Sequence, residues 1–181
     1  MFGTNPIAFS APRRGAPPIV IDLALSTVAR GNILKAAQAG TPIPEGWATD
    51  AEGNPTTNAA AALKGTLTPI GDAKGAALAL MVEILAVALT GANFSFEASS
   101  FFDGEGAPPH VGQFLIAVDP AAFAGGDLFA ERMETLAGEI TGQEGSRLPG
   151  MRVGALREAA NRDGLHVDSA LLAEVRELAG G

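Results

Sequence analysis

The stretch Ile19-Val20-Ile21-Asp22-Leu23-Ala24-Leu25-Ser26 decides how this chain folds. Residues 19–23 are mostly β-branched or aliphatic, which predicts a short strand that ends close to an acidic residue. Ser26 and Thr27 follow as candidate N-caps, so the chain passes from strand to helix within a few residues. A second short strand is predicted at 7–9, and the prolines between the two strands indicate a turn. We therefore expect both strand and helix around this stretch.

Further along the chain, apolar segments alternate with loops that are rich in glycine and proline. Residues 58–64 predict a short helix, and 75–90 predict a long apolar helix. Gln113–Asp119 is the clearest strand in the sequence. Three more helices are predicted at 127–139, 152–162 and 168–179. The loop Thr41–Thr57 is long for a compact domain, and Trp47 is interpreted as its anchor.

Composition excludes several classes of function. With 181 residues the chain can bury one good core, and its net charge of −8 argues against nucleic-acid binding, which needs clustered cations. The absence of cysteine excludes disulfides, thiolate nucleophiles and cysteine-bound zinc. No signal peptide is visible, so we expect a cytoplasmic protein. Gly75–Thr90 is shorter than the ~20 residues of a membrane span and carries Glu83 at its centre, so we expect a core helix and no membrane partner.

Two charged residues have contexts that suggest ligand binding. Lys74 lies at the entrance of the apolar helix, where backbone N–H groups and a mobile ammonium can bind a phosphate or carboxylate, and Gly75 would let a ligand approach the backbone. Spacing alone favours the alternative, a solvated lysine in a turn. Asp22 near the strand's end can accept hydrogen bonds from ribose hydroxyls or cap the following helix, and spacing leaves both interpretations open.

Candidates for proton transfer and metal binding are few. His110 and His166 are the two histidines, and neither local context indicates a catalytic role. Two histidines so far apart in the sequence do not predict a metal site. No strand is followed by the glycine pattern of a Rossmann cofactor site. We therefore predict no catalytic residue and no metal ligand in this chain.

A series of ordered motifs resembles the malate/L-lactate dehydrogenase family that lacks a Rossmann fold, which includes ureidoglycolate, sulfolactate and piperideine-2-carboxylate oxidoreductases. In chain order the motifs are Gly3–Phe9, Ile21–Ser26, Val28–Gly31, Pro42–Ala48, then Asp50, Gly53 and Pro55–Thr56, followed by Pro69–Gly71 with Lys74–Gly75, Leu80–Leu85, Gly112–Pro120 and Arg147–Gly150. They extend over nearly the whole chain. In such enzymes the first of these motifs lies near the middle, so the chain resembles the second half of a dehydrogenase.

The resemblance implies an α/β fold in which a mixed, non-Rossmann sheet flanked by helices binds NAD or NADP. It implies a cofactor-binding domain at 1–145 and a C-terminal helical segment at 146–181. The implied cofactor-binding residues are Asp22, Leu23, Ala24, Lys74, Gly75, Pro149 and Gly150. The implied partners are a small 2-hydroxy or 2-oxo acid substrate and a second subunit in a homodimer. The family's catalytic residues lie upstream of the Gly3–Phe9 motif.

A second hypothesis is a non-catalytic, truncated paralogue that binds nucleotide or pairs with a full-length subunit. It is favoured by Ala73, Ala76 and Met151, which stand where the family usually has polar residues at the cofactor rim. The dehydrogenase hypothesis depends on Lys74 and Asp22 converging on the same dinucleotide.

Overall fold

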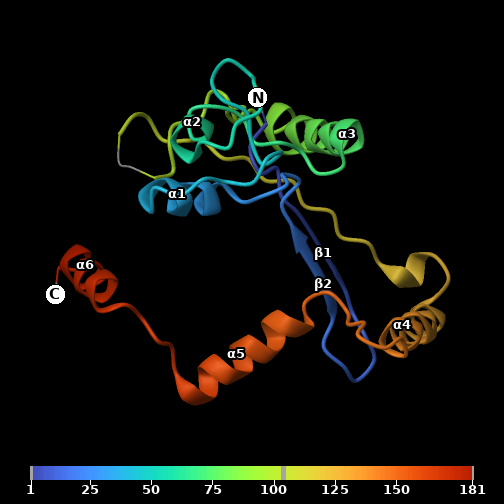
Figure 1. Ribbon diagram of the computed structural model, residues 1–181. Helices are drawn as coiled ribbons and strands as arrows, with labels where there is room; N and C mark the ends of the chain where they lie inside the picture. The colour runs from blue at the N-terminus through green and yellow to red at the C-terminus, as the bar shows by residue number, and fades with distance from the viewer. Residues whose placement is uncertain (1, 103–104, 181) are drawn as a thin grey trace. The chain divides into compact units, whose positions relative to one another are not determined.

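The computed structural model describes residues 2–102 and 105–180, and it shows a mixed α/β chain (Figure 1). Its strands and first helices are β1 (Ile7–Ala11), β2 (Ile19–Leu23), α1 (Arg30–Gln38), α2 (Ala59–Ala62) and α3 (Asp72–Val82). The π-helical turn η1 (Glu83–Ala88), the 3-10 turn η2 (Pro120–Ala122) and the helices α4 (Gly126–Thr141), α5 (Met151–Asp163) and α6 (Ser169–Leu178) follow. The predicted α/β class is confirmed. The larger mixed sheet stays a prediction, since the sheet found among the described residues has two strands.

The chain divides into two compact units. The first consists of Met1–Phe9 and Ile21–Gly126, and the second of Ser10–Val20 and Asp127–Gly181. The division passes through β1 and β2, so the hairpin contributes residues to each unit. The predicted boundary near residue 145 concerns the domains of the family fold and stays a prediction.

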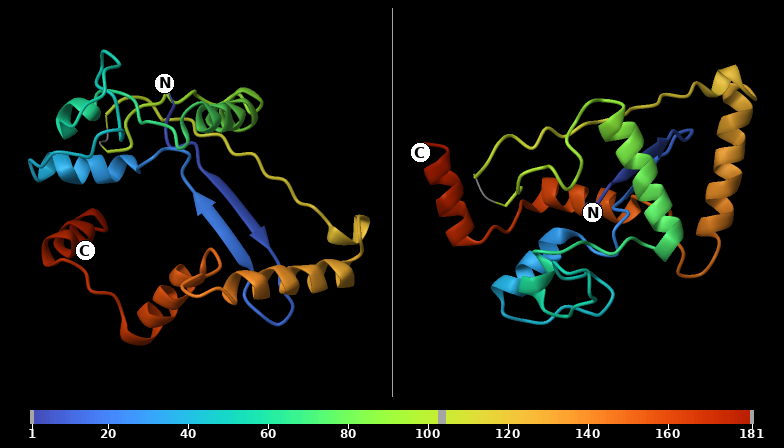
Figure 2. Two further views of the ribbon diagram at one scale, coloured as in Figure 1. Left: turned by 45° about the vertical axis from the view of Figure 1, so that its right-hand side comes forward. Right: turned by 90° about the horizontal axis from the view of Figure 1, so that it is seen from above.

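The two N-terminal strands form as predicted. β1 and β2 pair with each other and run side by side in both views of Figure 2. β1 extends two residues beyond the predicted 7–9, and β2 has the predicted limits. Pro12, Pro17 and Pro18 occupy the connection, where their missing N–H groups limit further extension of the ladder.

The core of the first unit lies between α1, α2 and the loop 41–57. Ile33 of α1 is completely buried, and Arg30 donates a hydrogen bond to the Leu63 carbonyl at the end of α2. Trp47 packs against this core, which agrees with its predicted role as the anchor of the loop. The buried members of the cluster are Val28, Ile33, Ile43, Ala48, Ala59, Ala62 and Leu67.

The predicted caps Ser26 and Thr27 are wrong for α1. That helix begins at Arg30, and its N-cap Ala29 offers no side-chain hydrogen bond. Ser26 is buried, forms a bridge with Pro69, and uses its hydroxyl to donate to the Val28 carbonyl at 2.8 Å. Its extended pairing therefore delays the helix by several residues.

The predicted apolar helix forms, but it changes its hydrogen-bonding pattern halfway. α3 is α-helical to Val82, and the π-helical η1 begins at Glu83. Short π-helical turns are often associated with functional sites. Within residues 2–102 and 105–180, no helix combines the length and hydropathy that crossing a membrane requires.

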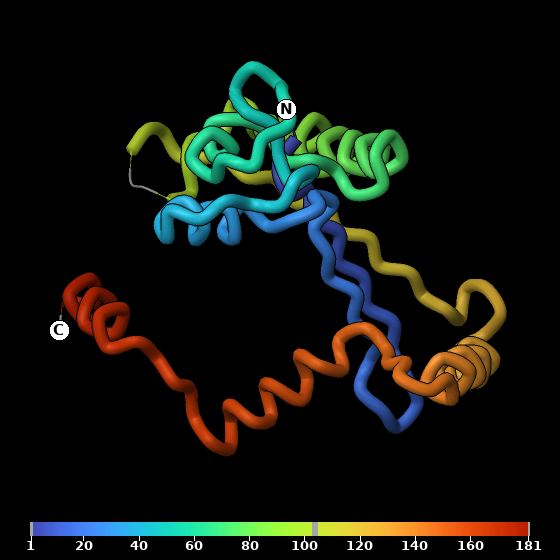
Figure 3. Tube along the Cα trace, in the orientation of Figure 1, coloured from blue at the N-terminus to red at the C-terminus, as the bar shows by residue number. Residues whose placement is uncertain are grey.

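The strand predicted at Gln113–Asp119 is wrong as a paired strand. Residues 111–119 have no assigned secondary structure, and Figure 3 shows this part of the chain as an extended trace. Most of its side chains are exposed. The apolar pattern is present, but none of the described residues provides a neighbouring strand for it.

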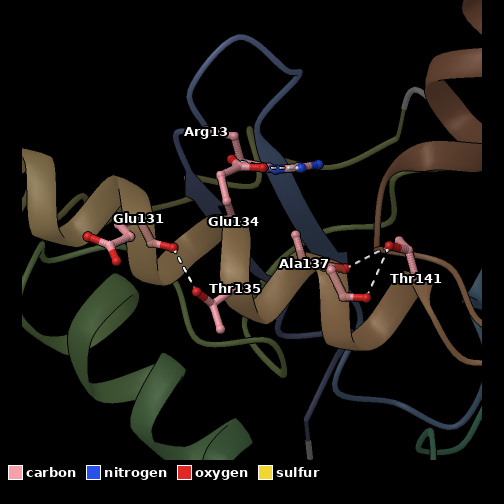
Figure 4. Close-up of polar contacts among 7 residues, drawn as sticks. Arg13, Glu131, Glu134, Thr135, Ala137 and Thr141 are labelled. Atoms are coloured by element: carbon pink, nitrogen blue, oxygen red, sulfur yellow. Dashed lines mark hydrogen bonds and ion pairs between the residues drawn. The ribbon is translucent and has the colours of Figure 1, made fainter.

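In the second unit, α4 is fixed to the turn of the hairpin by a charged pair. Arg13 donates through Nε and Nη2 to the two carboxylate oxygens of Glu134, at 3.1 and 2.6 Å (Figure 4). The Thr135 hydroxyl donates to the Glu131 carbonyl, and Thr141 donates to that of Ala137. These last two bonds lie within α4, whereas the Arg13 pair, together with an exposed pair between Arg14 and Asp127, links the helix to residues 10–20.

Candidate functional site

The first half of the candidate site is the exit of β2. Asp22 and Leu23 are exposed, and Ala24 is half-buried. The Leu25 N–H donates to the Thr4 carbonyl at 2.7 Å, which fixes the chain immediately after these residues. Asp22 is therefore open to solvent, and the hydrogen bond between Leu25 and Thr4 fixes the backbone just after it.

The second half of the candidate site is the start of α3. Gly71 and Asp72 both have positive φ, at 59° and 51°, so the chain turns sharply before the helix. Lys74 is exposed in the first turn. The N-terminal end of a helix favours anions, and Lys74 adds a full positive charge there.

Gly75 has a different role from the one its sequence context suggested. A Cβ at this position would lie 1.5 Å from the Ile70 carbonyl oxygen, so any residue other than glycine would clash with the backbone here. Gly75 is buried against its own chain instead of being open to a ligand. Its immediate function is to let the first turn of α3 pack closely on Ile70, and this packing fixes where Lys74 begins its side chain.

Backbone hydrogen bonds join the two halves. The Thr27 N–H donates to the Thr68 carbonyl at 2.8 Å, and the Ile70 N–H donates to the Leu25 carbonyl at 2.9 Å. The segment that follows Ala24 therefore lies directly against the segment that leads into Lys74. Within the described residues no ion pair or hydrogen bond joins Asp22 to Lys74, so both charges are free to meet a ligand.

Pro149 and Gly150 belong to the second unit. They form the turn before α5, where Gly150 has a φ of 83° and serves as the N-cap. A Cβ at Gly150 would lie 3.1 Å from the Val20 carbonyl oxygen and 3.2 Å from its Cβ, so the turn packs tightly on β2. Their assignment to a cofactor site stays a prediction.

A buried polar cluster behind the β2 exit was missed by the sequence analysis. Asn5 donates through Nδ2 to Glu83 Oε1 at 2.8 Å and to the Ala79 carbonyl at 3.2 Å, and Ser95 donates to the same Glu83 oxygen at 2.6 Å. An asparagine before a proline is typical of an ordinary turn, yet Asn5 is 7% exposed and has a φ of 40°. Asn5 Oδ1 and Glu83 Oε2 are buried and have no partner among the described groups.

One sequence signal pointed to this cluster. Glu83 is a single carboxylate in the middle of an apolar helix, and a buried charge requires partners. Asn5 follows Thr4, whose carbonyl binds Leu25, so the cluster supports the backbone from which Asp22–Ala24 projects. We regard it as part of the scaffold of the site.

One hollow in the described part of the molecule is lined by none of the residues of this candidate site. It is open, has a volume of about 580 Å³, and belongs entirely to the second unit. Three carboxylates line it, and its Arg14 is already paired with Asp127 at 2.6 Å, so it is poorly suited to a phosphate. Its lining residues are Arg14, Asp127, Leu128, Ala130, Glu131, Glu134 and Thr135. None of the predicted cofactor residues is among them.

Metal binding has no support in the described residues. Within 2–102 and 105–180 there is no group of three acidic, histidine or cysteine side chains that could hold an ion. His110 and His166 are both exposed in non-helical segments.

Comparison with known proteins identifies relatives along the whole chain. The chain is 53% identical over 179 residues to the (2R)-3-sulfolactate dehydrogenase (NADP(+)) of Chromohalobacter salexigens. The match covers 99% of this chain and 53% of that protein. It is 46% identical over 180 residues to the Delta(1)-pyrroline-2-carboxylate reductase of Pseudomonas fluorescens, covering 98% of this chain and 53% of that one. The chain spans about half the length of these relatives.

A solved structure shows the same path of the chain. The crystal structure of the delta1-piperideine-2-carboxylate reductase from Pseudomonas syringae pv. tomato superposes with a TM-score of 0.85 at 44% identity, over 98% of this chain and 54% of that one. The sequence profile of the malate/L-lactate dehydrogenases matches residues 1–176. With this match, and with close relatives at 53% and 46% identity, the chain belongs to the malate/L-lactate dehydrogenase family.

Proposed function

We propose that this chain provides the cofactor-binding part of an NAD(P)-dependent oxidoreductase that interconverts a 2-hydroxy acid, or a related imino acid, with its oxidised or unsaturated form. The names of the relatives support this class of reaction, since they act on sulfolactate and on pyrroline-2-carboxylate. One of them is named for NADP(+), which favours a nicotinamide dinucleotide here.

The observation that carries the proposal is the backbone pairing of 25–27 with 68–70. The segment that follows Asp22 adjoins the segment that leads to Lys74, and this adjacency supports the proposal that one ligand contacts both charges. In the proposed complex Lys74 binds a phosphate of the dinucleotide, and Asp22 accepts hydrogen bonds from ribose hydroxyls. Leu23 and Ala24 form the adjoining surface, and Gly75 contributes through the close packing that fixes where Lys74 begins. A role of Pro149 and Gly150 in cofactor binding is proposed from the family resemblance alone.

The chain's net charge of −8 makes the lysine important. A polyanionic ligand is repelled by the protein as a whole, so it depends on local cations and helix N-termini. The bound nicotinamide would supply the hydride chemistry. His110 and His166 lie in exposed, non-helical segments, so we propose that proton transfer depends on groups outside this chain.

A binding experiment tests the proposal directly. Titration of the chain with NADPH and with NADH, followed by calorimetry, should give saturable binding. Lys74→Ala should weaken binding by about tenfold or more, because a charge-assisted phosphate contact is lost. Lys64→Ala is the matched control, since Lys64 is also an exposed lysine of the first unit. Equal affinities of the two variants would refute the assigned phosphate contact.

A further inference from the structure

Two polar oxygens inside the first unit have no hydrogen-bond partner among the described groups. They are Asn5 Oδ1 and Glu83 Oε2, and the residues that carry them are 7% and 5% exposed. A buried acceptor without a donor costs free energy, and a buried carboxylate without a countercharge costs considerably more. The two oxygens therefore require an explanation, and they belong to side chains that already bind each other.

The orientation of the Asn5 amide is fixed by its contacts. Asn5 Nδ2 lies 2.8 Å from Glu83 Oε1 and 3.2 Å from the Ala79 carbonyl oxygen. Both of these oxygens accept hydrogen bonds, so the NH2 group, which has two hydrogens to donate, must face them. A flipped amide would place Asn5 Oδ1 against two other oxygens. Oδ1 is thus the end of the amide that lacks a partner.

The two oxygens of Glu83 are used unequally. Oε1 accepts hydrogen bonds from Asn5 at 2.8 Å and from the Ser95 hydroxyl at 2.6 Å, whereas Oε2 accepts none from the described groups. An ionised carboxylate has two equivalent acceptor oxygens, while a protonated carboxyl has one carbonyl oxygen that accepts and one hydroxyl that donates. The observed division matches the protonated form.

No cation neutralises this carboxyl within residues 2–102 and 105–180. None of the ion pairs in this part of the chain includes Glu83, and its two donors, Asn5 and Ser95, are neutral. A bound metal ion would need several oxygen ligands, and the same residues offer no group of three acidic, histidine or cysteine side chains. A proton is the positive charge that needs no further ligand.

The titratable side chains on α3 and on the segments that contact it leave this balance unchanged. All of them are exposed to solvent, and they are Asp22, Asp72, Lys74, Glu97 and His110. Most are acids, whose like charge disfavours an ionised Glu83. Lys74 lies at the opposite end of α3, where solvent screens its charge.

We propose that Glu83 is a neutral carboxylic acid and that its Oε2 hydroxyl donates a hydrogen bond to Asn5 Oδ1. A single proton then satisfies both unpartnered oxygens, and the acid and the amide form two hydrogen bonds with each other. We call this arrangement the acid–amide pair. It uses only residues of the first unit, and it does not require that the Lys74 region bind a cofactor.

The acid–amide pair makes the first unit sensitive to alkaline solution. It joins the N-terminal segment to the first residue of the π-helical η1, and the neighbouring Thr4 carbonyl accepts from the Leu25 N–H at the β2 exit. Loss of the proton leaves Oε2 and Asn5 Oδ1 without a donor and places a negative charge in the interior. The attachment of residue 5 to η1 is therefore weaker when the proton is absent.

Infrared spectroscopy of the original chain tests for the proton directly. At about pH 7 exposed carboxyl groups are ionised, so the C=O stretch of a carboxylic acid identifies a protonated one. We expect this band in the original chain and in Glu45→Gln, and its loss in Glu83→Gln. Glu45 provides the matched control, since it is an exposed acid of the same unit. Absence of the band from the original chain would overturn the proposal without reference to any variant.

The pH dependence of unfolding gives a second test. An unfolded chain loses the Glu83 proton above about pH 4–5, whereas the folded chain keeps it, so unfolding releases a proton that Glu83→Gln does not have. The original chain is therefore favoured in acid relative to this variant, and the advantage falls as the pH rises. The ratio of unfolding equilibrium constants, original over Glu83→Gln, should increase about tenfold or more between about pH 5 and about pH 7. The ratio for Glu45→Gln should stay nearly constant.

Three further results would contradict the proposal. A constant ratio for Glu83→Gln would show that folding leaves the protonation of Glu83 unchanged. An acid band that persists in Glu83→Gln would assign the proton to another carboxyl. Stabilisation of the original chain, but not of Glu83→Gln, by potassium or magnesium chloride over choline chloride at equal ionic strength would identify a bound cation in place of the proton.

Discussion

β2 and the segment 114–118 are similar in sequence but differ in their surroundings. β2 reads Ile-Val-Ile-Asp-Leu and the later segment reads Phe-Leu-Ile-Ala-Val, so both predict strands. β2 lies beside β1 and buries Ile19 to 7% exposure. The later segment has no paired neighbour among the described residues, and its Ile116 is 73% exposed.

The difference teaches that strand propensity and strand formation are separate properties. Local sequence determines whether a backbone is extended and apolar, but a sheet exists only where another strand completes the hydrogen bonds. β2 finds its partner a few residues away through a short hairpin connection. The later segment requires a partner that is distant in sequence or lies on other polypeptide.

The largest expected effect distinguishes the two isoleucines. Ile19→Ala should lower the free energy of unfolding by about 2–4 kcal/mol, because it removes buried methyl groups and leaves a cavity. Ile116→Ala should change it by less than about 0.5 kcal/mol in the isolated chain, since that side chain is already in solvent. Urea unfolding of both variants measures the difference. A similar loss for both would show that Ile116 is packed in solution.

These two regions also show how much the sequence could predict. The limits of β2 and the approximate limits of the helices α4 to α6 follow from local patterns. Local sequence offers Asp168 or Ser169 as the cap of α6, and the structure has Asp168 accepting hydrogen bonds from the Ala170 and Leu171 N–H groups. Ser26 was misassigned as a cap because its pairing with Pro69 depends on a segment more than forty positions away.

The candidate site was predictable in a similar, partial way. Lys74 and Asp22 could be selected from their local contexts and from the family resemblance. The adjacency of the two segments that carry them could not be predicted from spacing, because it depends on the hydrogen bonds between 25–27 and 68–70. The partnership of Asn5 with Glu83 across 78 positions was likewise invisible to a local pattern.

A second prediction concerns this buried cluster, which supports the exit of β2 and has no counterpart at 114–118. Glu83→Ala should lower the free energy of unfolding by about 1–3 kcal/mol, because Asn5 Nδ2 and Ser95 Oγ lose their common acceptor in a buried place. Thermal unfolding followed by circular dichroism measures it.

Glu83→Gln is the matched control for that prediction. Its amide oxygen can still accept from Asn5 and Ser95, and the variant carries no negative charge into the interior. We expect its stability to equal or exceed that of the original chain. If Glu83→Gln lowered the stability as much as Glu83→Ala, the negative charge itself would be essential for stability. A cation or a hydrogen-bond donor outside the described groups would then have to face Glu83 Oε2.

The smallest expected effect concerns the connection between β1 and β2, where Arg13 binds Glu134 of α4. The hydrogen bonds from Arg13 lower the pKa of Glu134 below its ordinary value. A lowered carboxyl pKa adds stability above the pKa of the unfolded chain, and this contribution is lost as the pH falls through the lower, folded pKa. Arg13→Gln should therefore be less stable than the original chain at neutral pH, and the difference should shrink as the solution becomes more acidic than about pH 4.

Arg14→Gln is the control, because its pair with Asp127 is exposed and should contribute little at any pH. A stability difference for Arg13→Gln that stays constant on acidification would mean that Arg13 acts through packing of its aliphatic stem, and the charged pair would then not be what holds the hairpin to α4.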